Sequence, residues 1–390
     1  MKKILLLCSI QLTGLFLLAQ ENEVKLADMK VPVAPAFSIL DYAPKTIENP
    51  GTIKAFSANL ATLAGQSGGI PRNFAFEFSP YWFFKHPSMN MYKYYGYKTT
   101  DQGFTSKPNI FYGLRSASIS FGSVFKDSSS TMPVDVNYIG YAVRANVINV
   151  RHSRVFRLFK ESIENVNESL GDALAAAQLK CATLADTLRI KCIGEAIATT
   201  KDSTFRANRE TFTKFLNARP LFSADLALAS STAFGNNSFS NSRRYRSGGW
   251  LTLAFYKPLV SSQKIKEDID NFLSCKNYLN AFLLFRYLSE NKTDDFKTFA
   301  KQNLVDIGGR LEFEFDRFSI SLESVKRFNN DKTVKNTSRT VGIAQYKINN
   351  DLFLVGTFGK DFGEIKNVIS LLGLNWGFGE KGINKPFNTP

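Results

Sequence analysis

The sequence predicts a mainly β protein, an antiparallel transmembrane β-barrel of about 12 strands that carries an α-helical hairpin insert. Three observations predict this fold. Apolar and polar residues alternate in about eleven segments, an amino-terminal stretch has the features of an export signal, and one long internal region has helical periodicity instead. Many of the alternating segments contain about ten residues or more, which is the length that a tilted strand needs to cross a bilayer.

The alternation is clearest between residues 304 and 323. Successive side chains of a strand point to opposite faces, so the pattern predicts one apolar and one charged face. A soluble β-sandwich would turn its apolar face towards a core. The charged residues on the opposite face, together with the export signal, favour a barrel with lipid outside and a wet lumen inside, because closure removes unpaired sheet edges from lipid.

Eight charged residues are candidates for the lumen-facing set. Their mixed signs predict weak ion selectivity. A barrel of 12 strands is also narrower than the open porins with about 16–18 strands, so the charges could pair and close the lumen. The candidates are Glu77, Arg144, Asp225, Asp306, Arg310, Glu312, Glu314 and Glu323.

The amino terminus predicts export. Lys2 and Lys3 precede an apolar stretch that ends near Leu18, so residues 1–19 are assigned as a signal peptide and the outer membrane as the destination. The barrel is assigned to residues 74–379 and a polar tail to residues 380–390. Residues 20–73 are left with two interpretations, a first strand that makes the strand number even or a plug inside the lumen.

Connection lengths predict the orientation of the barrel. The dipeptides 316–317 and 349–350 fit tight turns, and short turns in such barrels face the periplasm. Successive connections lie on opposite sides of the membrane. The periplasmic side is therefore also expected to hold 84–109, 154–217 and 259–276, and the outer side 126–134, 235–243, 291–302, 329–337 and 363–367.

Residues 154–217 have apolar residues at steps of three and four, which predicts an amphipathic helical hairpin. It would be either a docking arm for a periplasmic or membrane partner or a pair of helices that packs on itself or on the barrel. Cys181 and Cys192 are eleven residues apart, and one straight helix would separate them by about 16 Å. We therefore expect two unbonded, buried cysteines, unless the chain reverses between them.

The sequence offers little support for catalysis. With only two histidines, and with no cysteine or histidine spacing that fits zinc, we expect no catalytic residues, metal, cofactor or enzymatic activity. Arg243, Arg244 and Arg246 form a basic group that could contact lipopolysaccharide phosphates. An exported barrel would not meet nucleic acid, so that partner is excluded.

Three short motifs carry a resemblance to a known group of proteins. They are Leu17-Leu18-Ala19-Gln20, Pro35-Ala36-Phe37-Ser38-Ile39-Leu40 and Phe76-Glu77-Phe78-Ser79-Pro80-Tyr81-Trp82. With these motifs the chain resembles outer-membrane barrels of Bacteroidetes-type bacteria, which implies a location more than an activity. The expected function is a pore or transporter for small solutes across the outer membrane. The alternative is a non-conducting structural barrel whose insert binds a partner.

Overall fold

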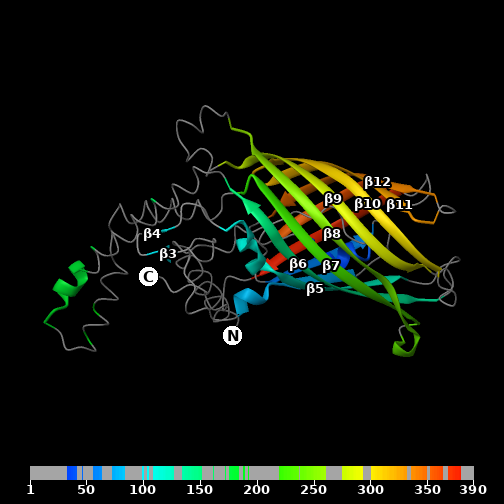
Figure 1. The fold of residues 1–390 in the computed structure, drawn as a ribbon, viewed down its shortest axis with the longest axis horizontal. Helices are drawn as coiled ribbons and strands as arrows, with labels where there is room; N and C mark the ends of the chain where they lie inside the picture. The colour runs from blue at the N-terminus through cyan, green and yellow to red at the C-terminus, as the bar shows by residue number, and fades with distance from the viewer. Residues whose placement is uncertain are drawn as a thin grey trace, which may run out of the picture.

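A computed structural model shows a closed antiparallel barrel of twelve strands (Figure 1). The strand number and the fold class predicted from the alternation are confirmed. The structure describes residues 33–41, 46, 56–63, 73–83, 99–100, 103–104, 109–126, 134–151, 161, 172, 175–183, 188, 192, 219–236, 238–260, 275–292, 300–331, 335–348, 352–362 and 368–378. The signal peptide assigned to 1–19 and the tail assigned to 380–390 lie outside the described residues.

The barrel strands follow one another around the wall in chain order, and β14 closes it by pairing with β1. They are β1 (Phe56–Leu63), β2 (Asn73–Phe78), β5 (Ser118–Lys126), β6 (Val136–Val150), β7 (Phe222–Gly235), β8 (Ser242–Pro258), β9 (Asn277–Lys292), β10 (Ala300–Phe315), β11 (Phe318–Asn329), β12 (Thr337–Lys347), β13 (Leu352–Lys360) and β14 (Val368–Phe378). Outside the barrel wall, the described residues form a separate strand pair, β3 (Thr99–Thr100) and β4 (Gly103–Phe104). They also form three short 3-10 helices, at Pro80–Phe83, Ile110–Ser116 and Phe239–Asn241.

Strand β1 decides where the barrel begins. It pairs with β14 on one side and with β2 on the other, in registers that place Phe56 opposite both Phe378 and Phe78. The barrel therefore starts at residue 56 rather than at residue 74, and β1 makes the strand number even. The predicted tight turn at 316–317 is present between β10 and β11, where Asp316 has a φ of 40°.

The two faces of the wall differ as the alternation predicts. Large apolar side chains point outward and stay exposed, among them Leu322 at 61% and Leu228 at 55%. The neighbouring positions point inward and are buried, including Glu323 and Ala227. A β-sandwich would bury the apolar face, so that interpretation is wrong.

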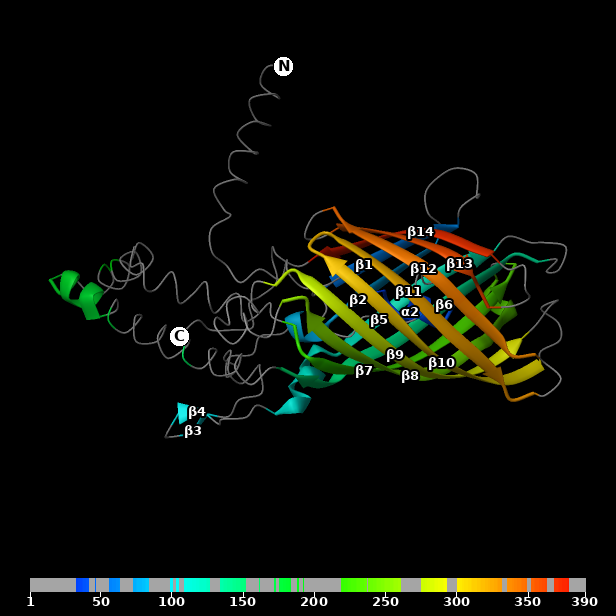
Figure 2. The ribbon, with the colours of Figure 1, turned by 90° about the horizontal axis from the view of Figure 1, so that it is seen from above.

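The inner face encloses part of the chain itself, which we call the inner segment (residues 33–41 together with Thr46). It contains the short helix α2 (Pro35–Ser38), which Figure 2 shows among the strands and which contacts β2, β5, β6 and β7. Val33, Phe37 and Ile39 are fully buried. Glycines in the wall permit this approach, because a Cβ on Gly140 would lie 2.7 Å from the Ala36 carbonyl oxygen.

Only part of the predicted helical insert lies within the described residues. Of the region 154–217, residues 161, 172, 175–180, 188 and 192 are helical, and 181–183 form a turn. Cys181 and Cys192 are joined by a disulfide with a Cα–Cα distance of 6.0 Å. The expectation of two unbonded cysteines is therefore wrong, because the chain turns at Cys181 instead of continuing as one straight helix. In the part of the chain that the structure describes, no helix is long and apolar enough to span a membrane.

Candidate functional site

The strand register brings three arginines together on the inner face of the barrel. Arg286 on β9 and Arg327 on β11 both stand directly opposite Asp306 on β10. Arg246 on β8 stands opposite Glu290 on β9. Directly opposed residues of an antiparallel pair have neighbouring side chains, so the register alone pairs each arginine with a carboxylate.

The two carboxylates of the wall fix the arginine side chains. Arg286 donates from Nε to Asp306 Oδ2 at 2.8 Å, and Arg327 donates from Nε to Asp306 Oδ1 at 2.8 Å. Arg246 donates to Glu290 Oε2 from Nε at 3.0 Å and from a terminal nitrogen at 2.7 Å. All five residues are buried. Each carboxylate holds its arginine in place, because breaking a buried ion pair would leave a charge unpaired in a low-dielectric interior.

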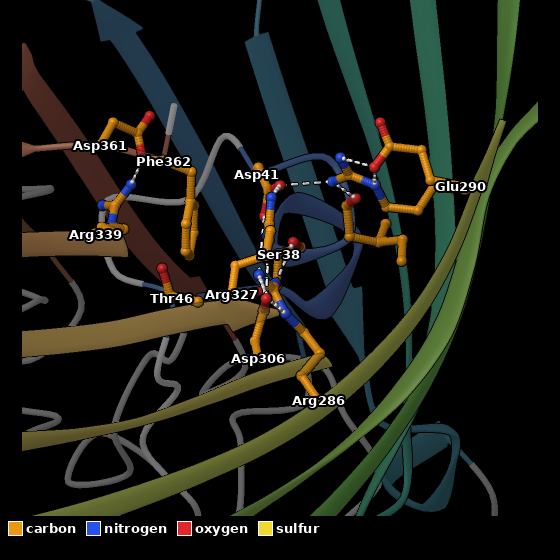
Figure 3. Close-up of polar contacts among 12 residues, drawn as sticks. Ser38, Asp41, Thr46, Arg286, Glu290, Asp306, Arg327, Arg339, Asp361 and Phe362 are labelled. Atoms are coloured by element: carbon orange, nitrogen blue, oxygen red, sulfur yellow. Dashed lines mark hydrogen bonds and ion pairs between the residues drawn. The ribbon is translucent and has the colours of Figure 1, made fainter. Parts of the chain in front are cut away.

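Asp41 of the inner segment completes the group, which we call the inner charge cluster (Asp41, Arg246, Arg286, Glu290, Asp306 and Arg327). Its Oδ1 accepts from Arg286 at 3.0 Å and from Arg327 at 3.3 Å. Its Oδ2 accepts from Arg246 at 2.7 Å and from Arg327 at 3.0 Å. Figure 3 shows Asp41 between the wall residues, with Asp306 below it and Glu290 to one side.

Backbone carbonyls of the inner segment bind the same arginines. The Ser38 oxygen accepts from Arg286 at 3.0 Å, and the Ile39 oxygen accepts from Arg246 at 2.9 Å. Burial would raise the pKa of Asp41, but the positive charges of Arg246, Arg327 and Arg286 hold it well below its usual range. Asp41 is therefore a carboxylate at neutral pH.

Three further hydrogen bonds fix the inner segment to the wall. The amides of Ala34, Ala36 and Thr46 donate to side-chain oxygens of Asn59 at 2.8 Å, Ser120 at 3.1 Å and Glu323 at 2.9 Å, respectively. Next to the inner charge cluster, the void between the inner segment and Arg286 and Arg339 is too small for a water molecule.

The structure places all eight candidate lumen residues on the inner face, but in several groups instead of one site. Asp306 lies in the inner charge cluster, and Glu323 binds Thr46 and lies 3.6 Å from Arg339. Two pairs lie elsewhere on the wall, Glu77 with Arg144 at 2.8 Å and Asp225 with Asn146. The last three candidates are linked: Arg310 lies above the Phe282 ring and 3.8 Å from Glu312, and Asn280 donates to both Glu312 and Glu314. Glu314 also accepts from Arg219 at 2.6 Å.

The basic group on β8 requires a correction. Arg243 and Arg244 are exposed, as expected of a surface contact, but Arg246 is 4% exposed and belongs to the inner charge cluster. The reason is a register shift, in which Ser231 pairs with Arg246 and Thr232 with Arg244. The extra residue in β8 interrupts the alternation, so residues two apart no longer share one environment.

Sequence reasoning missed Asp41, Arg286, Glu290 and Arg327. Three of these could have been found, since Arg286 and Glu290 share one face of β9, and Arg327 shares the face of Glu323. Asp41 has no such signal, because it lies in a segment without strand periodicity. Within the described residues, no group of three histidine, cysteine or acidic side chains could hold a metal ion.

The fold and the site together define a closed twelve-stranded antiparallel barrel with part of its own chain bound inside. No family model and no curated protein matches the chain. Among solved structures, the chain is similar to the toluene transporter TbuX of Ralstonia pickettii, with a TM-score of 0.27, 7% identity, and coverage of 89% of this chain and 94% of that chain. Similarity at this level carries no argument about function.

Proposed function

We propose that the protein is an outer-membrane transporter for small solutes whose lumen is closed at rest by the inner segment. The observation that carries this proposal is the position of residues 33–41, which are buried inside a closed barrel and bound to the charged side chains of three strands. The proposal assigns the protein no catalytic chemistry.

The outer surface of the wall supports the membrane location. Exposed apolar side chains such as Val143, Phe285 and Ile320 repeat on the outward face of the barrel strands from β2 to β14. An apolar surface this extended is unfavourable in water, whereas the hydrocarbon core of a membrane can cover it. The predicted export signal fits the same location, and the exposed Arg243 and Arg244 could contact lipopolysaccharide phosphates.

The way the inner segment is attached supports a movable closure. Its hydrogen bonds with Asn59, Ser120 and Glu323 run through wall side chains, and so do those with the three arginines. The backbone ladder of the barrel takes no part in these contacts. The inner segment can therefore leave the lumen without breaking a strand pair, which a transporter needs and a permanent structural core does not.

A reversible covalent lock tests the proposal. A Cβ built on Gly122 lies 3.3 Å from the Cβ of Ala36, close to the separation found across disulfides. In the variant Ala36→Cys/Gly122→Cys, with Cys275→Ser to remove the free thiol, oxidation should fix the inner segment to β5. We expect planar bilayers to show discrete conductance steps for the reduced protein and silence for the oxidised protein.

The variant Ala36→Cys/Cys275→Ser, which lacks the cysteine at position 122, is the matched control, and its conductance should not respond to oxidation. A doubly substituted protein that conducts equally in both redox states would contradict the closure. A protein that is folded and inserted but silent in every state would contradict transport itself.

The second candidate function is a non-conducting barrel that binds a periplasmic or membrane partner through residues 154–217. The disulfide between Cys181 and Cys192 favours it, because a cross-link within the insert stabilises a defined local shape. The variant Cys181→Ser/Cys192→Ser should then lose a partner that co-purifies with the native chain, while conductance stays absent in both proteins.

A further inference from the structure

We propose that the place of the Asp41 carboxylate in the inner charge cluster is a binding site for a carboxylate-bearing solute, which Asp41 fills when no solute is bound. This inference rests on the proposed function, because in the native protein a solute can take the place of Asp41 only when the inner segment moves.

The arginines are arranged for a ligand that the wall does not supply. Each one is fixed on one side by Asp306 or Glu290, through hydrogen bonds that involve the Nε atom. Each one directs terminal nitrogens to Asp41, so the donors converge on one point from β8, β9 and β11. Because the wall carboxylates position the guanidinium groups, these donors need not rearrange when Asp41 leaves.

The charges of the wall residues specify an anion. Three arginines face two wall carboxylates, Asp306 and Glu290, and Asp41 brings the inner charge cluster to neutrality. Without Asp41, one positive charge remains in a buried position, where an unpaired charge is costly. A single negative charge restores the balance.

The geometry selects a carboxylate among anions. Asp41 accepts two hydrogen bonds on each of its two oxygens, all between 2.7 and 3.3 Å. The planar fork of a guanidinium group matches two oxygens held in one plane, and chloride offers only a single point acceptor. The side chain of Asp41 also retains 21% exposure, so a small ion can reach its position from solvent.

The test uses formate as the probe, because formate is the group that the substitution Asp41→Ala removes. Thermal unfolding of full-length Asp41→Ala is measured in detergent while formate replaces chloride at constant ionic strength. We expect the midpoint of unfolding to rise with the logarithm of the formate concentration, because formate binds the folded state selectively. Calorimetric titration should show formate bound about tenfold or more tightly than chloride, the factor expected when one charge-assisted hydrogen bond is gained.

The native protein is the matched control, because its Asp41 already occupies the place that formate would fill. Its midpoint of unfolding should rise far less with formate than that of Asp41→Ala. An equal rise of both proteins, or no response of Asp41→Ala, would overturn the carboxylate site.

A second measurement keeps Asp41 in place and does not depend on the folding of the alanine variant. Ser38 is 2% exposed in the inner segment, so a thiol in Ser38→Cys/Cys275→Ser reacts with a polar maleimide only when the segment moves. Acetate in place of chloride at constant ionic strength should speed labelling, because it competes with Asp41 for the arginines. Unchanged labelling would overturn the inference.

The two proposals can fail separately. Formate binding without any conductance would support the carboxylate site and refute the proposed transport. Conductance without formate binding would support transport and refute the carboxylate site.

Discussion

The substitution Asp41→Ala should release the inner segment without unfolding the barrel. Asp41 accepts four hydrogen bonds from three arginines that stay positively charged after its loss. Removal of one partner from a buried ion pair destabilises by about 3–5 kcal/mol, and the 21% exposure of Asp41 favours the lower end, about 3 kcal/mol. Because about 1.4 kcal/mol corresponds to a factor of ten, the population with the segment released should increase by roughly 100-fold.

The assay is the labelling rate of Ser38→Cys by a membrane-impermeant maleimide in the Cys275→Ser background, with and without Asp41→Ala. Labelling limited by release of the segment should accelerate by the same roughly 100-fold, since the buried thiol reacts only in the released state. The disulfide-bonded Cys181 and Cys192 do not react. Glu314→Ala should leave the rate unchanged. An unchanged rate in the Asp41→Ala protein would refute the conclusion that this carboxylate fixes the inner segment.

Three further predictions follow from single contacts. Closure of the lumen should be insensitive to pH between 8 and 5. The pKa of Asp41 is lowered in the folded protein. The stability that Asp41 contributes to closure is therefore fully present above its unfolded pKa of about 4, and it is lost only as the pH falls through the lowered folded-state pKa. Conductance recorded across this range checks this prediction, and opening near pH 6 would contradict it. The charged and titratable groups that face Asp41 are Arg246, Arg286, Arg327, Asp306, Glu290, Lys126 and Tyr245. Gly140→Ala should raise the Ser38→Cys labelling rate, because its Cβ would meet the Ala36 carbonyl at 2.7 Å at a cost of about 1–3 kcal/mol, whereas Gly356→Ala, with nothing within 4 Å, should not. Arg144→Ala should lower the unfolding midpoint, because it removes the arginine that neutralises the buried Glu77 carboxylate, at a cost of about 3–5 kcal/mol. An unchanged midpoint would show that this pair does not stabilise the wall.

The wall of the barrel could be predicted from the sequence because its signal is local. The direction of a strand side chain depends on its position in the alternation, so Asp306, Arg310 and Glu312 could be assigned to one face without knowledge of any partner. The alternation gave about eleven segments, and a first strand within residues 20–73 was one of two interpretations of the remaining chain; β1 at Phe56–Leu63 supplied that strand.

The candidate site was predicted only in part because it depends on which strands are neighbours and in which register. Asp306 was identified as an inward residue, but its two arginines lie 20 residues before it and 21 residues after it in the chain. The register shift beside Arg246 reversed the expected exposure of that residue. Neither a register nor an extra residue in a strand can be deduced from alternation within one strand.

The sequence by itself therefore determined the closed β wall, the apolar outer face and the charged inner face, because the period of two acts within each strand. The tertiary structure alone decided that Asp41 joins three arginines inside the barrel and that Cys181 bonds Cys192. Both depend on the path of segments that have no strand periodicity, and that path is set by contacts between residues far apart in the chain.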